Sequence, residues 1–337
     1  MENTTTLGCL VLLCIFITFP RTKGACRFRR FGIDCRYSCN CPGGCNDVNG
    51  VCRGPCYPGW HSGNGTVCQT KNIAYNGSTK QSSNYYTFKY LSNKAVDGNR
   101  DQNIYDGSCS HTGLNKTSAS WQVNIEPPTQ IYQVKMYYRQ DLRKRFRRFT
   151  LYLNDVDEEW RVCYHHQKDS IQSIVNVNCN ITTKTKALFV YNERGTPETS
   201  GQSYERHAYM ELCEVEVYVC SKGTYGDCRQ FCYCKDGPCD FITGQCPGSG
   251  LCENGFTGQH CQTDCSSIGK YGVNCSESCS ASHCFNRQMC HRVTGRCLDG
   301  CQDGWIEPTC VKHTQVVPCH LSVKVNSDAT ELCIRSL

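Results

Sequence analysis

Four short segments rich in β-branched and aromatic residues decide the fold class of this chain. The first is IYQVKMYY, residues 131–138, and the others are FTLYL (149–153), ALFVY (187–191) and VEVYV (215–219). Such residues favour strands, polar turns separate the segments, and no long helical period runs through this part of the chain. Strands at short spacing without helices predict an all-β sandwich or jelly roll within residues 70–219.

Cysteine usage separates this middle stretch from its flanks. Of the 337 residues 32 are cysteine, which is far above ordinary usage. Only four of them lie from Cys109 to Cys213, so the middle stretch is long enough to bury a core of its own, whereas the flanks depend on cross-links. Disulfides at this density need an oxidising compartment, which predicts a secreted, extracellular protein.

Composition and motifs exclude several function classes. Hydrophobic residues make up 39% and charged residues 20% of the chain, as in a globular protein. The net charge of +6 is small for a nucleic-acid binder. The chain contains no HExxH, GxSxG, GxGxxG or P-loop pattern, so we expect a protein that is not an enzyme.

The N-terminus has the pattern of an export signal. Residues 7–19 (LGCLVLLCIFITF) form an apolar run of signal-peptide length, which predicts a signal peptide over residues 1–25 that takes Cys9 and Cys14 with it. No later stretch has the length of a membrane span, so the mature product is expected to be soluble. Export permits glycosylation at the sequons Asn64, Asn76, Asn115, Asn180 and Asn274.

Three blocks of eight cysteines flank the middle stretch and repeat one pattern. Each block has an aromatic-glycine pair before its second cysteine and a glycine-aromatic pair before its last. The blocks resemble EGF-like modules of the eight-cysteine, laminin-like kind, as in multiple-EGF, scavenger-type proteins. The resemblance implies modules at residues 26–69, 220–262 and 263–311, followed by an unassigned tail at 312–337.

The resemblance also implies a disulfide pattern, in which cysteines one and three, two and four, five and six, and seven and eight of a block pair. In the first block these pairs are Cys26–Cys39, Cys35–Cys41, Cys45–Cys52 and Cys56–Cys68. Eight cysteines allow many other pairings, and the third block has a longer spacing between its third and fourth cysteines. In the tail, Cys319 and Cys333 either pair with each other or begin an incomplete repeat.

Zinc binding is the competing interpretation of the closely spaced cysteines. Cys39-x-Cys41 and Cys232-x-Cys234 are the candidate zinc ligands. Zinc sites favour a CxxC spacing and need reduced thiols, so this interpretation is the weaker one.

Four motifs follow one another in the middle stretch. They are AVDGNR (95–100), GSCSHT (107–112), RQD (139–141) and LCEVEV (212–217). In this order they resemble the F-type lectin (fucolectin-like) domain over about residues 70–219. The resemblance implies a jelly roll that binds L-fucose and a structural calcium ion.

The resemblance assigns roles in a sugar site. His111 and Arg139 would donate hydrogen bonds to sugar oxygens, and Asp141 would orient the Arg139 side chain. Tyr105 and Ile104 would form the apolar wall for the fucose methyl group.

The chain departs from the family pattern at two places. The second arginine of the family should follow Asp141 after four residues, but that position is Phe146, and Arg145 is the available substitute one residue earlier. Leu142 and Arg143 stand where F-type lectins often have two adjacent cysteines. The resemblance therefore predicts the lectin fold, whereas the sugar pocket of this chain is either retained or altered.

The same resemblance implies a calcium site and two disulfides. The calcium ligands would be Asp97, Asn99, Ser108, Cys213 and Glu214, and several of them would bind through their backbone carbonyls. The disulfides would be Cys109–Cys213 and Cys163–Cys179. The first closes a loop of about 100 residues, which stabilises by up to about 4–5 kcal/mol in the chain-entropy model.

A basic run, RKRFRR at residues 143–148, lies between two predicted strands and is expected to be an exposed loop. It either contributes one sugar-binding arginine or binds sulfated, heparin-like glycans by charge. A protease-processing site is a further possibility that the cross-linked surroundings disfavour.

The sequence therefore predicts a secreted, glycosylated lectin that binds terminal fucose or related glycans, in the recognition of microbial or host cell surfaces. The alternative is an EGF-repeat adhesion or scavenger-type protein whose central domain binds protein or sulfated glycans instead. Because one lectin site gives little avidity, a homo-oligomer is expected.

Overall fold

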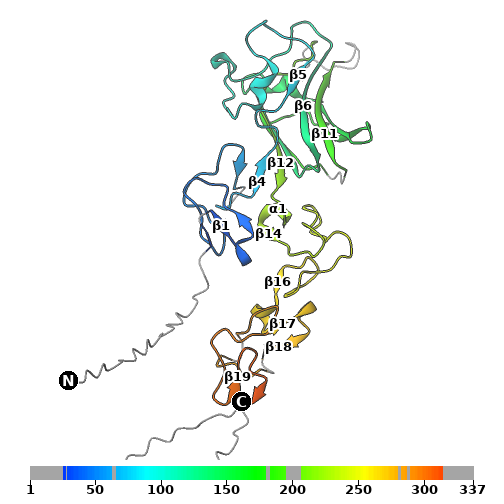
Figure 1. Ribbon diagram of the computed structural model, residues 1–337. Helices are drawn as coiled ribbons and strands as arrows, with labels where there is room; N and C mark the ends of the chain where they lie inside the picture. The colour runs from blue at the N-terminus through cyan, green and yellow to red at the C-terminus, as the bar shows by residue number, and fades with distance from the viewer. Residues whose placement is uncertain are drawn as a thin grey trace, which may run out of the picture.

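The computed structural model describes residues 26–27, 29–62, 66–179, 183–194, 206–279, 282–286 and 289–313 (Figure 1). The predicted signal peptide (1–25) and all but two residues of the predicted tail (312–337) lie outside the described residues. Among the described residues, no helix has the length and apolarity to cross a lipid bilayer.

The middle of the chain is a sandwich of two antiparallel five-stranded sheets, so the predicted all-β sandwich is confirmed. The first sheet has the order β10-β7-β12-β4-β3, with bounds Ile174–Val177, Gln133–Tyr138, Leu212–Cys220, Thr70–Asn72 and Trp60–His61. The second has the order β5-β6-β11-β8-β9, with bounds Thr79–Gln81, Ser118–Thr129, Thr185–Glu193, Thr150–Asp155 and Trp160–His165. Three 3-10 turns complete it: η2 (Ser92–Val96), η3 (Ile104–Asp106) and η4 (Arg143–Phe146).

The core lies between the two sheets and follows the two-residue alternation of strands. On β6, Ala119, Trp121, Val123 and Ile125 are at most 1% exposed and belong to this core. The central strand β12 is buried along its whole length, so it has a second buried face besides the one that packs on the core. That second face holds charged residues, which must find partners there.

Two neighbouring strands carry the chain into and out of the sandwich. β4 pairs antiparallel with β12, and Thr70 lies opposite Cys220. The first two cysteine-rich modules therefore leave the sandwich at the same end and lie side by side (Figure 1). β3 comes from the end of the first module and pairs with β4, so the sheet continues across the expected boundary between residues 69 and 70.

An aromatic cluster joins the first two modules. Phe31 and Tyr37 of the first module contact Phe231 of the second at ring-centroid distances of 5.6 and 4.5 Å. The Tyr37 hydroxyl donates to the Cys232 carbonyl at 3.2 Å. Tyr37 is 4% exposed, so these contacts make one shared core out of two modules that are too small to bury much alone.

The modules consist of short hairpins and turns. Their elements are β1 (Arg30–Phe31), η1 (Ile33–Cys35), β2 (Tyr37–Ser38), β13 (Thr224–Tyr225), α1 (Gly226–Arg229), β14 (Gln230–Phe231), β15 (Phe256–Thr257), β16 (Thr263–Asp264), η6 (Cys265–Ile268), β17 (Lys270–Tyr271), η7 (Val273–Cys275), β18 (Glu277–Ser278), β19 (Trp305–Ile306) and β20 (Lys312–His313). With so little regular structure, the disulfides supply most of the cross-linking.

The disulfide pattern expected for the first module is wrong in three of its four pairs. The structure has Cys26–Cys35, Cys39–Cys45, Cys41–Cys52 and Cys56–Cys68, so cysteines one and two, three and five, four and six, and seven and eight pair. The second and third modules repeat this pattern: Cys220–Cys228, Cys232–Cys239, Cys234–Cys246 and Cys252–Cys261, then Cys265–Cys275, Cys279–Cys290, Cys284–Cys297 and Cys301–Cys310.

Backbone pairing explains the correction. Cys45 and Cys52 lie opposite each other in an antiparallel bridge, so their sulfurs lie side by side on one face. Cys39 and Cys41 flank Asn40, whose backbone is left-handed with a φ of 48°, and both cysteines are 0% exposed. Cys39 forms a disulfide with Cys45, and Cys41 forms one with Cys52. Every cysteine of the described residues is in a disulfide, which is the state expected outside the cell.

Three of the five sequons lie in the described residues. Asn76, Asn115 and Asn274 are exposed, and each has a left-handed backbone with φ between 51° and 58°. Asn64 and Asn180 lie outside the described residues.

Candidate functional site

A buried carboxylate, Glu211, lies at the centre of the predicted sugar site. It directly precedes β12 and is 0% exposed. Its Oε1 atom accepts from Nη1 of Arg139 at 2.6 Å and from Nη1 of Arg145 at 3.3 Å, and lies 2.9 Å from Nε2 of His111. The Tyr138 hydroxyl donates to Oε2 at 2.8 Å. The site is therefore one carboxylate that gathers three basic side chains from two loops: His111 precedes β6, and Arg139 and Arg145 lie in the connection between β7 and β8.

The charges around Glu211 keep it ionised. Burial by itself raises the pKa of its carboxyl, but the hydrogen bond and charge of His111, together with those of Arg139, outweigh burial and hold the pKa below its usual value. Sequence reasoning missed Glu211. The available signal was an acidic residue beside the LCEVEV motif, among residues that are otherwise apolar.

His111 is held between aromatic rings. The Tyr85 ring stacks on it with a centroid distance of 4.5 Å, and Tyr209 meets it edge-on at 6.0 Å. Its Nδ1 lies 2.5 Å from the Thr112 carbonyl oxygen, while Nε2 faces Glu211. Both ring nitrogens thus face oxygen acceptors, and the side chain is 4% exposed.

Arg139 and Asp141 interact as the resemblance implied. Nε and Nη2 of Arg139 donate to the two carboxylate oxygens of Asp141 at 2.8 and 2.6 Å, which is a bidentate pair. The hydrogen bond from Arg139 lowers the pKa of Asp141, which is about half exposed. Because a guanidinium has five N–H groups, Arg139 keeps hydrogens on Nη1 and Nη2 for a ligand after binding Asp141 and Glu211.

The family pattern puts its second arginine at position 146, but in this chain the arginine that reaches Glu211 is Arg145. Its guanidinium lies over the Tyr209 ring at 4.2 Å and contacts Glu211. Phe146 instead is 0% exposed and stacks between Tyr138, at 4.5 Å, and Phe149, at 4.1 Å. The aromatic ring at 146 therefore belongs to the core, and the arginine beside it turns to the site.

The two residues predicted to form the apolar wall lie in different surroundings. Ile104 is 4% exposed and packs with Tyr90, Cys109 and Tyr137, so its side chain belongs to the core. Tyr105 is 74% exposed, and the Arg139 guanidinium lies 6.0 Å from its ring centroid.

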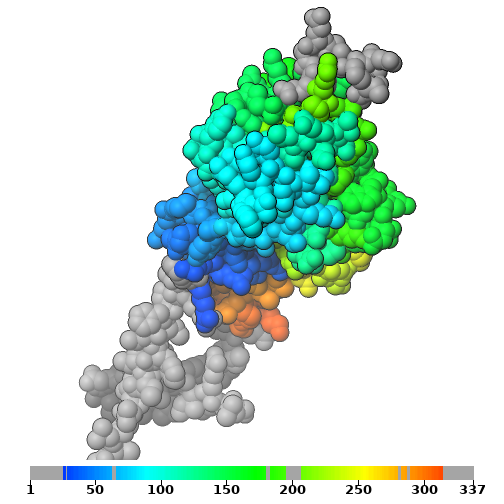
Figure 2. Space-filling model, turned by 90° about the horizontal axis from the view of Figure 1, so that it is seen from above, coloured from blue at the N-terminus to red at the C-terminus, as the bar shows by residue number. Residues whose placement is uncertain are grey.

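Further apolar surface comes from a loop that sequence reasoning missed. Tyr86 is 54% and Phe88 92% exposed, and Tyr86 packs at 4.3 Å on Tyr85, the ring that stacks on His111. The aromatic run NYYTF at 84–88 was the available signal. Seen from the sandwich end, the segment drawn in cyan, to which this run belongs, occupies the middle of the face (Figure 2).

The residues expected to bind calcium converge on Glu214 of β12. Its carboxylate is 0% exposed, and its Oε2 accepts from the backbone N–H of Gly98 at 3.1 Å, within the Asp97–Asn99 turn. Its Oε1 is buried and has no hydrogen-bond partner among the described residues. Gly98 has a φ of 86°, and a Cβ there would lie 2.9 Å from the Tyr75 ring, so only glycine fits this turn.

The surroundings of Glu214 disfavour its charged form. Burial, with the nearby charges of Glu216 and Asp97, raises the pKa of Glu214 to about 8, although the Gly98 N–H opposes the shift. A buried carboxylate with one unpartnered oxygen is costly unless a cation or a proton neutralises it. The oxygen-rich donor set fits a hard cation such as calcium.

The other expected calcium ligands differ in which of their oxygen atoms already take part in hydrogen bonds. Asp97 Oδ1 accepts from the Asn99 N–H, and Asn99 Oδ1 accepts from the Asp101 N–H. The Ser108 hydroxyl donates to the Asn103 carbonyl, which leaves the Ser108 backbone carbonyl as its ligand atom. Cys213 lies at a β-bulge between Leu212 and Glu214, which takes its backbone out of the regular ladder.

Both disulfides that the resemblance implied in the sandwich are present. Cys109–Cys213 closes a separation of 104 residues and ties the His111 loop to the strand that carries Glu211 and Glu214. Cys163 of β9 pairs with Cys179, which follows β10, so this bond links the two sheets at one edge.

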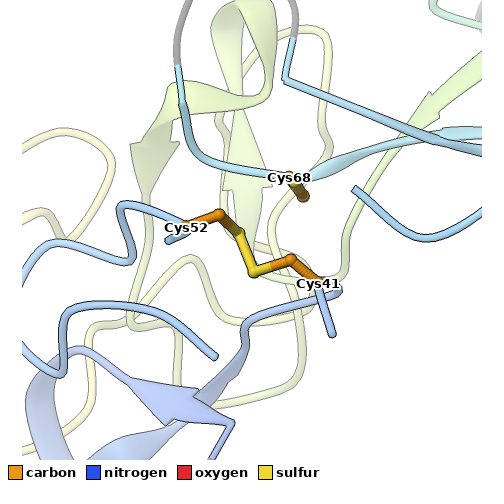
Figure 3. Close-up of side chains that lie close together, drawn as sticks. All are labelled: Cys41, Cys52 and Cys68. Carbon is orange, nitrogen blue, oxygen red and sulfur yellow. A yellow bond between two sulfur atoms is a disulfide. The ribbon is translucent and has the colours of Figure 1, made fainter. Parts of the chain in front are cut away.

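Sulfur atoms that lie close together in the modules do not form zinc sites. In the first module Cys41, Cys52 and Cys68 cluster, but Cys41 is bonded to Cys52, as Figure 3 shows, and Cys68 is bonded to Cys56. Cysteines in disulfides offer no thiolate to zinc. Cys39 and Cys232 are also in disulfides, so the zinc interpretation is wrong for both closely spaced pairs.

The basic run at 143–148 is only partly an exposed loop. Arg143, Lys144 and Arg148 are exposed, but Arg147 is 5% exposed and donates to the Asp169 carbonyl at 2.7 Å. With Arg145 turned to Glu211, three of the five basic side chains remain as a surface patch.

Comparison with known proteins agrees with this architecture. Residues 94–188 match the family model described as the NedA-like, galactose-binding domain. Stabilin-2 of Mus musculus is 34% identical over 143 residues, which are 36% of this chain and 5% of that protein. Cell death abnormality protein 1 of Caenorhabditis elegans is 42% identical over 101 residues, 27% of this chain and 8% of that protein. The chain thus spans a small part of the length of both.

Among solved structures, a fucose binding module of Streptococcus pneumoniae is 30% identical, with a TM-score of 0.36, and the match covers 44% of this chain and 94% of that module. Together with the fold, the family match confirms the predicted resemblance of the middle stretch to a lectin-like sandwich of the galactose-binding type.

Proposed function

We propose that the sandwich binds a terminal fucose, or a related sugar, at the cluster formed by His111, Arg139 and Arg145. The observation that carries this proposal is the convergence of three basic side chains on the buried carboxylate of Glu211, next to exposed aromatic rings. The protein would act outside the cell, as its disulfides require, in the recognition of cell-surface glycans.

The two kinds of surface fit the two faces of such a sugar. Guanidinium N–H groups bind neighbouring hydroxyl and ring oxygens of a sugar in a fixed geometry. The carboxylate of Glu211 contacts both Arg139 and Arg145 and so holds these donors in place. The exposed rings of Tyr105 and Tyr86 offer apolar contact to a methyl group or to the face of a sugar ring. Leu142 and Arg143 stand where the family often has paired cysteines, so the aromatic rings would replace that packing surface.

A matched pair of arginine variants tests this function. Arg145→Ala removes a charged donor and should weaken binding of methyl α-L-fucoside by about 10- to 100-fold. Arg143→Ala, on the same turn but exposed, should leave the affinity within about twofold. Isothermal titration of the full chain with calcium present measures both, with methyl β-D-galactoside as the comparison sugar.

Other results would favour the alternative functions. If no sugar binds, and Arg143→Ala weakens heparin binding whereas Arg145→Ala does not, the exposed basic patch of Arg143, Lys144 and Arg148 is the binding surface. High salt should then abolish that binding. If neither sugar nor heparin binds, the sandwich is a structural or protein-binding unit. Sedimentation of the secreted chain would test whether it forms the homo-oligomer that avidity needs.

We further propose that a calcium ion binds Glu214 with Asp97, Asn99, Ser108 and Cys213. Glu214 and Asp97 would supply carboxylate oxygens, and Ser108 and Cys213 backbone carbonyls. When bound, the ion neutralises the buried carboxylates. Because Cys213 is bonded to Cys109 and Glu211 is two residues before it, ordering this strand also orders the sugar site.

Removal of calcium should destabilise the sandwich. With free calcium at about 100 times its dissociation constant, the ion contributes about 2.7 kcal/mol, so a chelator should lower the melting temperature of the sandwich by roughly 5–10 °C in calorimetry. Glu214→Gln should abolish this response, and Asp157→Asn, at an exposed acidic position, should keep it. A full calcium response in Glu214→Gln would refute the proposed site.

A further inference from the structure

The backbone of the turn that carries Arg145 is held from outside the site by the end of strand β11. Asn192 Nδ2 donates to the Arg145 carbonyl oxygen at 2.9 Å, and Nη2 of Arg194 donates to the same oxygen at 2.6 Å. Nη1 of Arg194 also donates to the Arg147 carbonyl at 3.3 Å. Two side chains from one strand end therefore bind the backbone on both sides of Phe146.

These two side chains form a unit inside the protein. Asn192 is 0% and Arg194 6% exposed, and Asn192 Oδ1 accepts from Nη1 of Arg194 at 2.5 Å. That contact sets the orientation of the Asn192 amide, so that its NH₂ group faces the Arg145 carbonyl. A buried guanidinium loses its hydration, so its placement against backbone carbonyls is expensive unless the geometry is well satisfied.

The turn that carries Arg145 is fixed at further points. Phe146 is stacked between two rings, and the Arg147 guanidinium donates back to the Lys144 carbonyl at 3.2 Å. The Arg145 guanidinium itself contacts Glu211 at 3.3 Å and lies over the Tyr209 ring. Because a side chain starts from its own backbone, a turn fixed at these points also sets the direction in which Arg145 leaves it.

We propose that Asn192 and Arg194 are positioning residues that aim Arg145 at the sugar site. The chain has its arginine one residue before the position that the family pattern predicts, and the Asn192–Arg194 pair holds the turn in the conformation that brings this arginine to Glu211. This inference rests on the proposed function for its effect on sugar affinity, but the placement of Arg145 can be measured without a ligand.

A double-mutant cycle tests the affinity effect. Asn192→Ala removes one hydrogen bond to the Arg145 carbonyl and should weaken methyl α-L-fucoside binding by about five- to tenfold. In the Arg145→Ala background the same change should have no further effect, because its path to the ligand is gone. Asn154→Ala, at a buried asparagine of the neighbouring strand β8, is the control and should leave affinity unchanged. Equal losses from Asn192→Ala in both backgrounds would show a merely structural role and overturn the proposal.

A spectroscopic measurement separates this inference from the proposed function. In a ¹⁵N spectrum of the full chain, the Nε–H signal of Arg145 is identified by its loss in Arg145→Ala. Asn192→Ala should shift or broaden this signal, and Asn154→Ala should leave it in place. If the signal is unchanged in Asn192→Ala, the positioning role is refuted. If it moves as expected but no sugar binds the wild-type chain, the positioning role stands and the sugar-binding function fails.

Discussion

Replacing Glu211 with alanine is expected to abolish sugar binding and to lower the free energy of unfolding of the sandwich by about 3–5 kcal/mol. The carboxylate is 0% exposed, accepts from Arg139 and Arg145, and lies 2.9 Å from Nε2 of His111. Without it the two guanidinium groups lose their shared negative partner inside the protein, and the Tyr138 hydroxyl loses its acceptor. Fucoside titration and chemical denaturation of the sandwich transition measure the two effects.

Asp141→Ala is the matched control for the loss of a carboxylate beside the same arginine. Asp141 binds Arg139 in a bidentate pair but is about half exposed, so water screens its charge. Its removal should cost less than about 1 kcal/mol of stability. If Glu211→Ala were as mild as Asp141→Ala, Glu211 would not be the group that holds the site together.

Replacing Phe146 with arginine, the residue that the family pattern expects there, should prevent the sandwich from folding rather than improve sugar binding. Phe146 fills the space between Tyr138 and Phe149 in the core. Loss of a buried phenylalanine alone costs about 3–5 kcal/mol, and an unpaired buried charge costs more. The measurements are the yield of secreted protein and the near-ultraviolet circular dichroism of what is recovered.

Two further variants make this result interpretable. Phe146→Ala should remain folded at low temperature but lose about 3–5 kcal/mol of stability, since it leaves a cavity without adding a charge. Phe88→Ala, at a 92% exposed phenylalanine, should change stability by no more than about 0.5 kcal/mol. A Phe146→Arg protein that folds and binds fucoside more tightly would show that the assignment of Arg145 to the site is wrong.

Local patterns predicted much of this architecture because they report directly on local forces. The β-branched and aromatic segments at 131–138 and 149–153 pointed to the strands that the structure has as β7 and β8, and the cysteine blocks pointed to small cross-linked modules. The pairing of cysteines was beyond such patterns, since it depends on which sulfurs the backbone bridge Cys45–Cys52 brings together. Ile104 was misplaced for a similar reason, because both an apolar wall and a core position favour isoleucine.

The sequence by itself determined the fold class, the cross-linked flanks and most members of the site: His111, Arg139, Asp141 and the Cys109–Cys213 bond. Only the tertiary structure decided which arginine enters the site and what holds the basic groups together. Arg145 faces Glu211 because the ring of Phe146 is buried in the core and because Asn192 and Arg194 donate hydrogen bonds to the Arg145 carbonyl. The hydrogen bonds of Arg145 to Asn192, Arg194 and Glu211 join residues 47, 49 and 66 positions apart, and their energy depends on burial, which no local spacing reveals.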